Sequence, residues 1–234
     1  ENLGDFSHRI LYYESSRGCP FSCSYCLSSI DNLHAPEIRC SAKEESREGA
    51  FGIPECMPPI RRRTFKEKRV RFRDLELVRQ ELEAFLEAGV AQVKFVDRTF
   101  NCNREHASAI WKYLLENDNG VTNFHFEIAA DLLGEEELTL LSQMRPGLVQ
   151  LEIGVQSTNP DTLREINRSA DMGKLRKTVE RIRQGRNIHI HLDLIAGLPF
   201  EDYGSFGRSF DEVYAMAPQQ LQLGFLKVLK GTPM

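Results

Sequence analysis

The sequence predicts an α/β fold in which six strand–helix units form an open or closed parallel barrel. Two observations support this fold class. Apolar segments of strand length alternate along the chain with amphipathic segments of helix length, and 234 residues fall within the size range of α/β barrels. Because parallel strands are joined by right-handed crossovers, successive units curl in one direction. In such barrels the chemistry lies at the carboxyl ends of the strands, so polar residues there are the first candidates for a site.

The first two units are separated by a long irregular segment. Residues 9–14 (RILYYE) form a short apolar and aromatic run that predicts the first strand. Asp74 is a typical N-cap for the amphipathic segment 75–88, whose apolar residues recur at spacings of three and four. Residues 91–97 (AQVKFVD) predict the second strand, and Asn103 can cap a helix that runs to residue 115.

The remaining four units follow without interruption. Residues 123–130 (NFHFEIAA) alternate as a strand should, and Asn159-Pro160-Asp161 is a cap followed by a proline at the first helical position. In chain order, the other predicted elements are a helix at 134–144, a strand at 147–155, a helix at 172–184, a strand at 187–199, a helix at 205–216 and a last strand at 219–229.

Residues 31–68 do not fit this alternation. They have no clear period, are charged throughout and are rich in proline near one end. A structureless run of this length is unusual inside a compact domain, so we interpret it as an insertion, either a lid over the barrel mouth or a mobile loop. We treat residues 1–234 as one domain. Because the chain begins with Glu1 and stops just after a predicted strand, we expect it to be a segment of a longer protein.

Composition indicates an ordinary globular protein. The chain is 41% hydrophobic and 27% charged with a net charge of −4. No apolar run approaches the roughly 20 residues that cross a bilayer, and no signal peptide is recognisable, so we expect no membrane association. Six cysteines without a secretory leader favour a reducing cytoplasm, where thiols more often bind metals or act in chemistry than form disulfides.

The most informative motif is a cysteine triad, Cys19-Pro-Phe-Ser-Cys23-Ser-Tyr-Cys26, with C-x3-C-x2-C spacing and no fourth cysteine nearby. Ferredoxin-type clusters and closed zinc sites take four protein ligands. Three thiolates can hold a 4Fe-4S cluster and leave one iron open to an exogenous ligand. A zinc knuckle, a disulfide and scattered core cysteines are the alternative interpretations.

The triad resembles the signature of the radical S-adenosylmethionine (SAM) enzymes, C-x3-C-x-aromatic-C, with Tyr25 at the aromatic position. The resemblance implies a partial, six-stranded (β/α) barrel, a 4Fe-4S cluster and SAM bound at the open iron. One electron from the cluster would cleave SAM, and the resulting 5′-deoxyadenosyl radical would abstract hydrogen from a substrate. It also implies an external electron donor of the flavodoxin or ferredoxin type and a small-molecule substrate whose identity the sequence does not reveal.

Polar residues at the strand ends match SAM-contacting positions of this superfamily. Asp97 stands where many members carry a Gly-Gly-Glu motif that binds the methionine ammonium; the glycines are absent here, and a structural capping role is the alternative. The resemblance to oxygen-independent coproporphyrinogen oxidases implies the other contacts: Glu127 in the SAM site, Gln156 through its amide, Arg168 on the SAM carboxylate, Asp193 at the ribose, and Ile195 in a motif that packs on adenine.

Four phrases resemble the cobalamin-binding branch of the superfamily: YYESSRGCPFSCSYCLSS, VKFVDRTFNCN, LEIGVQS and DLIAGLPFED. Members of that branch carry a separate cobalamin domain. Cobalamin is therefore expected only in a missing domain of the parent protein, where methyl transfer or rearrangement would be the chemistry.

Three further features stay open at the sequence level. Cys102 is a candidate for facing the substrate, and a small buried hydrophobe is the alternative. Cys40, Cys56 and His34 fall short of a second four-ligand metal site. The stretch 61–73 carries eight basic residues and one acid, which suits RNA phosphates or a solvated charged face.

Two other classes of function compete with SAM cleavage. An iron–sulfur protein of electron-transfer or structural type would need a fourth protein ligand, for which Cys40 is available. A zinc-containing nucleic-acid module would use the basic stretch, but the barrel pattern argues against it.

Overall fold

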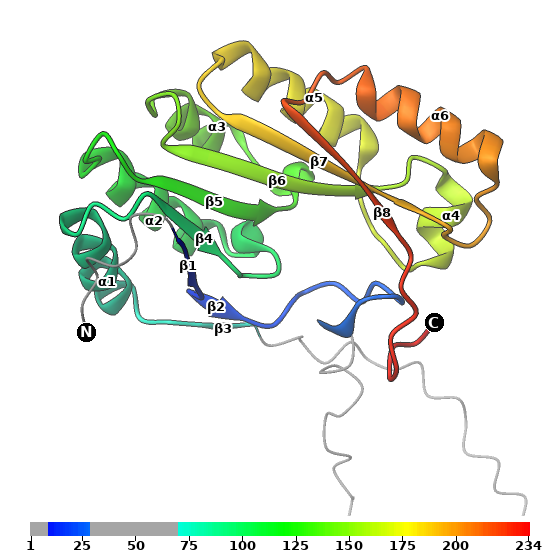
Figure 1. Ribbon diagram of the computed structural model, residues 1–234, viewed down its shortest axis with the longest axis horizontal. Coiled ribbons are helices and arrows are strands. Elements are labelled where there is room, and N and C mark those ends of the chain that lie inside the picture. The colour runs from blue at the N-terminus through cyan, green and yellow to red at the C-terminus, as the bar shows by residue number, and fades with distance from the viewer. Residues whose placement is uncertain (1–8, 29–69) are drawn as a thin grey trace, which may run out of the picture.

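The computed structural model describes residues 9–28 and 70–234. Its centre is a parallel sheet of six strands in the order β1-β4-β5-β6-β7-β8, and Figure 1 shows this sheet curving with its helices on the outer side. The strands are β1 (Ile10–Tyr13), β4 (Gln92–Phe95), β5 (Asn123–Ile128), β6 (Val149–Gln156), β7 (His189–Ala196) and β8 (Gln220–Phe225). Strand order follows chain order and β1 and β8 lie at opposite edges, so the predicted partial (β/α) barrel is confirmed.

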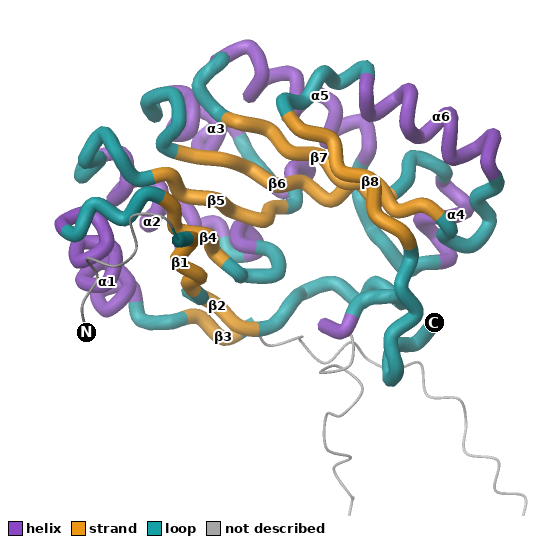
Figure 2. The backbone as a smooth tube through the Cα atoms, viewed as in Figure 1, coloured by secondary structure: helices purple, strands orange, loops and turns teal. Residues whose placement is uncertain are grey.

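Helices connect the strands and cover one face of the sheet (Figure 2). They are α1 (Leu75–Glu87), α2 (Arg104–Glu116), α3 (Glu135–Ser142), α4 (Pro160–Glu165), α5 (Met172–Gly185) and α6 (Tyr203–Tyr214), with short 3-10 turns η3 (Phe100–Cys102) and η4 (Ala130–Leu132). The N-caps predicted from sequence form: Asp74 accepts hydrogen bonds from the first turn of α1, Asn103 from that of α2 and Asn159 from that of α4.

The sheet has one apolar and one polar face because the strand residues alternate. Large side chains on the helix-covered face form a core that includes an aromatic group of Phe95, Phe100, Phe126 and Trp111, all without exposed surface. Burying a side chain of this size contributes about 1.5–3 kcal/mol. This packing holds the strand ends in fixed positions.

The opposite face is polar across the central strands. In register, Glu127 of β5 lies beside Glu152 of β6, Glu152 beside His191 of β7, and Gly154 beside Asp193. A parallel sheet covered by helices on both faces would be apolar on both. This polar face is therefore the inner side of the partial barrel.

The boundaries of several strands differ from the prediction. The run 187–199 forms a strand only at His189–Ala196, because Gly197 takes a positive φ of 88° that leaves the extended conformation. An antiparallel pair, β2 (Ser16–Arg17) with β3 (Arg71–Phe72), was not predicted. Its two-residue strands are too short to show a periodic pattern.

The loop that carries the cysteine triad leaves the β1 edge of the sheet and reaches the segment after β8 (Figure 1). There the N–H of Met234 donates a hydrogen bond to the carbonyl of Ser24, at 3.1 Å. The loop therefore lies across the opening between the first and last strands.

The predicted insertion at 31–68, with His34, Cys40 and Cys56, lies outside the described residues, as does most of the basic stretch 61–73. Within 9–28 and 70–234, no helix combines the length and apolar character that a membrane span requires.

Candidate functional site

The cysteine loop is held in place by backbone contacts with the segment after α4. The N–H of Ser24 donates to the carbonyl of Ile166 at 2.9 Å, and Nδ2 of Asn167 donates to the carbonyl of Ser22 at 3.0 Å. Within the loop, the N–H of Cys26 donates to the carbonyl of Cys23 at 3.1 Å. Cys23 and Cys26 thus lie at the two ends of one tight turn.

The three thiols of the triad influence one another electrostatically. Burial raises the pKa of Cys19, and the neighbouring Cys23 and Cys26 raise it further, while a contact of 3.7 Å with Oγ1 of Thr99 lowers it. None of the four described cysteines forms a disulfide. Neighbouring thiols need a cation to stabilise their thiolates together, which is what a metal cluster supplies. The donor set therefore fits a cluster.

Arg168 links the triad to the sheet. Its Nη1 lies 3.7 Å from Sγ of Cys23, and its Nη2 donates to the carbonyl of Gly154 in β6. Burial alone disfavours the guanidinium cation, but Tyr25 and Cys23 raise the pKa of Arg168. Its buried Nε has no hydrogen-bond partner among the described residues, so one donor of the fork remains available to a ligand.

Gln156 ends β6 in a bulge. The register shifts between Gly154 and Gln156, and Gln156 takes a positive φ of 72°. Its amide folds back over Gly154, where a Cβ atom would clash with Nε2 of Gln156. The buried Oε1 of Gln156 has no partner within the described part of the chain. A glycine is thus needed for Gln156 and Arg168 to meet at the strand end.

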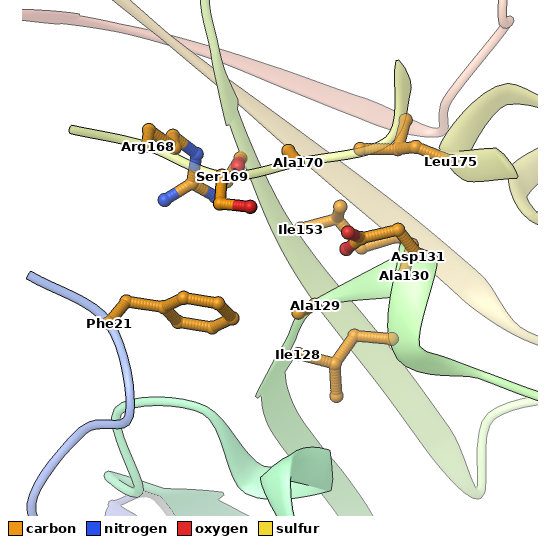
Figure 3. A pocket seen from close by; sticks show the side chains of 11 residues that line it. Phe21, Ile128, Ala129, Ala130, Asp131, Ile153, Arg168, Ser169, Ala170 and Leu175 are labelled. Carbon is orange, nitrogen blue, oxygen red and sulfur yellow. Dashed lines mark hydrogen bonds between the residues drawn. The ribbon is translucent and has the colours of Figure 1, made fainter. Parts of the chain in front are cut away.

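A small pocket opens beside Arg168, between the cysteine loop and the ends of β5 and β6 (Figure 3). The ring of Phe21 points into it from the cysteine loop, and Ala129 and Asp131 line it from the turn after β5. Asp131 accepts a hydrogen bond from the N–H of Asp171 at 3.2 Å. Sequence reasoning missed Phe21 and Asp131, although Phe21 lies within the motif.

Tyr25 and Ile195, the two predicted apolar contacts, lie in one cluster. Both pack against the buried side chains of Leu163, Ile166 and Leu198. Burial raises the pKa of the Tyr25 hydroxyl, which therefore stays protonated. This cluster connects the cysteine loop to the end of β7.

Asp97 has no exposed surface, and its carboxylate is engaged on both oxygens. Oδ2 accepts from the N–H of Ser15 at 3.1 Å, and Oδ1 accepts from the hydroxyls of Ser15 and Ser16 at 2.8 and 2.5 Å. Nε2 of His106 lies 3.2 Å from Oγ of Ser15. Asp97 therefore anchors the segment between β1 and β2, which fits the structural alternative, while its contact with SAM stays a prediction.

Cys102 lies in η3, close enough to Cys19 of the triad for the two thiols to interact electrostatically. Burial, together with Cys19 and Asp97, raises the pKa of Cys102 to about 11. The raised pKa favours a protonated thiol near neutral pH, as expected for a partly buried structural cysteine. Its predicted contact with substrate stays untested.

Glu127 and Asp193 belong to a different group of polar residues on the inner face of the sheet. Glu127 lies 3.7 Å from Nζ of Lys94, and burial raises the pKa of Glu127, with Glu152 adding to the effect. Asp193 lies 3.0 Å from Nε2 of His191, and burial raises its pKa. The structure does not bring either carboxylate to the cysteine loop.

Comparison with known proteins identifies the family. The model of the radical SAM superfamily matches residues 13–213. The oxygen-independent coproporphyrinogen III oxidase of Pseudomonas aeruginosa is 32% identical over 110 residues, which are 47% of this chain and 23% of that protein.

Solved structures share the fold. The cobalamin- and cluster-containing radical SAM methyltransferase TsrM from Kitasatospora setae superposes with a TM-score of 0.70 at 17% identity, over 97% of this chain and 38% of that one. Coproporphyrinogen III oxidase HemN from Escherichia coli superposes with a TM-score of 0.60 at 18% identity, over 94% of this chain and 44% of that one. The cobalamin-dependent SAM radical enzyme OxsB superposes with a TM-score of 0.59 at 16% identity, over 96% of this chain and 34% of that one. The chain thus spans less than half the length of each of these proteins.

Proposed function

Because the chain belongs to the radical SAM superfamily, we propose that it is the catalytic barrel of an enzyme that binds a 4Fe-4S cluster and SAM. The observation that carries the proposal is the contact between the buried Arg168 and Cys23, which places the cysteine loop beside the end of β6 in a barrel with a polar inner face. Three protein ligands to a four-iron cluster leave one iron for SAM. When bound, the cluster supplies the electron that cleaves SAM to a 5′-deoxyadenosyl radical.

In this proposal Cys19, Cys23 and Cys26 hold the cluster, and the loop contacts to Ile166 and Met234 fix its position over the strand ends. Arg168 binds the SAM carboxylate through its fork of donors, since its Nε has no partner among the described residues.

Other residues position SAM along the strand ends. The amide of Gln156, whose Oε1 is likewise unpartnered in the described part, accepts a hydrogen bond from SAM. Tyr25 and Ile195 supply the apolar side of the site, and Glu127 and Asp193 the polar side on the inner face of the sheet.

The substrate would be a small molecule bound against that polar face, with the electron arriving from a flavodoxin- or ferredoxin-type donor. The likeness to TsrM and OxsB supports a cobalamin-dependent parent protein, with cobalamin held outside these residues and methyl transfer as one outcome. Product analysis separates the possibilities, because S-adenosylhomocysteine beside 5′-deoxyadenosine would indicate methyl transfer.

Anaerobic reconstitution tests the binding part of this proposal. The purified chain should take up about four irons and four sulfides, and SAM should change the electron paramagnetic resonance spectrum of the reduced cluster. A chain that holds zinc in place of iron, or whose cluster spectrum is insensitive to SAM, would contradict it. Ala at Cys23 should abolish the uptake, whereas Ala at Cys102 should leave it unchanged.

A further inference from the structure

Two buried histidines and a glutamate on the inner face of the sheet converge on one point. His125 of β5 and His191 of β7 are 7% and 4% exposed, and Glu152 of β6 lies between them. One ligand atom from each lies within 4.8 Å of the others. Glu152 pairs in register with His191, so neighbouring strands fix these positions.

Three imidazole nitrogens at this point, Nε2 of His125 and both nitrogens of His191, make no aligned hydrogen bond within the described residues. Nε2 of His125 lies 2.8 Å from Oε2 of Glu152, yet without the alignment of an N–H···O bond. Both nitrogens of His191 are likewise buried and unpartnered among the described residues, although Oδ1 of Asp193 is 3.0 Å from Nε2. Buried polar atoms without a partner are costly. A shared ligand that accepts nitrogen lone pairs would remove that cost.

The local charge favours a cation. The carboxylates of Glu127 and Glu152 share the ammonium of Lys94, and the guanidinium of Arg98 also acts on Glu127. The carboxylate of Asp193 lies beside His191 instead. Lys94 places Nζ 2.9 Å from Oε2 of Glu152, the same oxygen that lies 2.8 Å from Nε2 of His125, so its ammonium competes with a metal ion for that oxygen. The pairing of His191 with Asp193 is the arrangement that orients imidazoles at metal centres.

We propose that His125, Glu152 and His191 form a binding site for a divalent transition metal ion, separate from the cysteine loop. Two imidazoles and one carboxylate are the donor set of zinc sites with an open coordination position and of non-heme iron(II) sites. Metal–ligand bonds of about 2.0–2.2 Å require small side-chain rotations from the present separations. The open positions would face the polar interior, where an oxygen or nitrogen donor of a substrate can bind.

Cobalt(II) is a suitable probe because its visible absorption reports coordination and distinguishes thiolate from imidazole ligands. The experiment uses the full chain with Ser at Cys19, Cys23 and Cys26, so that no cluster forms. One Co²⁺ per chain should bind with d–d absorption and without a thiolate charge-transfer band, and Zn²⁺ should displace it. Since the two sites share no ligand, this result does not depend on the proposed SAM chemistry.

Variants test the assignment of ligands. Glu152→Gln and His191→Ala should each weaken Co²⁺ binding by at least about tenfold, a loss typical of disturbed metal sites. Lys94→Met should strengthen Co²⁺ binding, because the substitution removes a competing cation. Misfolding would weaken binding, so it cannot explain a gain in affinity. His189→Ala is the matched control, since His189 is in the same strand but outside the trio, and it should bind as the parent does.

Three results would overturn the proposal: no cobalt spectrum, a spectrum dominated by thiolate charge transfer, or a spectrum that survives both Glu152→Gln and His191→Ala. Unchanged or weaker binding in Lys94→Met would also contradict the geometry proposed for Glu152.

Discussion

Arg168 lies 145 residues after Cys23 in sequence, yet its Nη1 is 3.7 Å from the Cys23 thiol. Its other terminal nitrogen holds the carbonyl of Gly154 at the end of β6. One guanidinium therefore fixes the distance between the cysteine loop and the sheet, and it does so where Oε1 of Gln156 remains unpartnered among the described residues. This relationship connects the proposed cluster ligands to the strand-end residues.

Arg168→Ala should weaken SAM binding to the cluster-loaded chain at least about tenfold. A hydrogen bond to a charged group contributes about 1.5–3 kcal/mol, and each 1.4 kcal/mol is a factor of ten. Equilibrium binding of SAM measures the effect. Arg164→Ala is the control, because Arg164 is 77% exposed in its ion pair with Asp161 and lies in the preceding helix. Equal affinity in both variants would exclude Arg168 from the SAM site.

Gly154→Ala should also reduce SAM affinity while the fold remains. The added Cβ would clash with Nε2 of Gln156, so this amide must move, whereas Nη2 of Arg168 would lie 3.6 Å away in ordinary contact. Gly207→Ala in α6 meets nothing within 4 Å and should stabilise the chain by up to about 1 kcal/mol. Circular dichroism and urea unfolding verify the fold of both variants. Unaltered SAM binding in Gly154→Ala would show that this strand end does not contact SAM.

Asp97→Asn should lower the free energy of unfolding by about 1–3 kcal/mol, because an amide cannot accept all the hydrogen bonds that Ser15 and Ser16 donate to the buried carboxylate. Urea denaturation of the cluster-free chain measures this. Asp74→Asn should be nearly neutral, since asparagine caps a helix as well as aspartate does. If Asp97→Asn leaves stability unchanged but impairs SAM binding, Asp97 contacts SAM as the sequence predicts.

Glu137 should give the chain a pH-dependent stability on the acid side. Hydrogen bonds from Arg104 hold the pKa of Glu137 below its ordinary value of 4.5. Because the pKa of Glu137 is lower in the folded than in the unfolded state, the stabilisation from this carboxylate is complete above its unfolded-state pKa. The stabilisation is lost as the pH falls through the folded-state pKa. Unfolding free energies measured between pH 3 and about pH 6 should therefore rise less with pH in Glu137→Gln than in the parent chain.

Glu135→Gln provides the comparison for this measurement, because Glu135 is an exposed neighbour in the same helical turn. Its pH profile should follow that of the parent. If the unfolding free energy of Glu137→Gln also follows the pH dependence of the parent, the ion pair between Arg104 and Glu137 contributes nothing to stability.

Much of the architecture could be predicted from sequence because each unit repeats the same local signals. Asp74, Asn103 and Asn159 mark helix starts, and the apolar period distinguishes helix from strand. The cysteine spacing likewise predicted a cluster site at Cys19, Cys23 and Cys26 without any tertiary information, and that assignment stays a prediction.

Tertiary relationships could not be predicted in the same way. The partners of Asp97 are serines more than 80 residues away, so the sequence favoured a cofactor role and could not reveal the anchoring role that these contacts show. The histidines of NFHFEI and HIHLDLIA alternate with apolar residues, which indicates one face of a strand, but only the register between strands brings His125, Glu152 and His191 together.

Formation of 5′-deoxyadenosine tests the central claim most directly. The anaerobically reconstituted chain, reduced with dithionite in the presence of SAM, should release 5′-deoxyadenosine, and Cys23→Ala should release none. A preparation loaded with cluster that yields no 5′-deoxyadenosine, or a Cys23→Ala variant that yields as much as the parent, would contradict the assignment of this site to SAM cleavage.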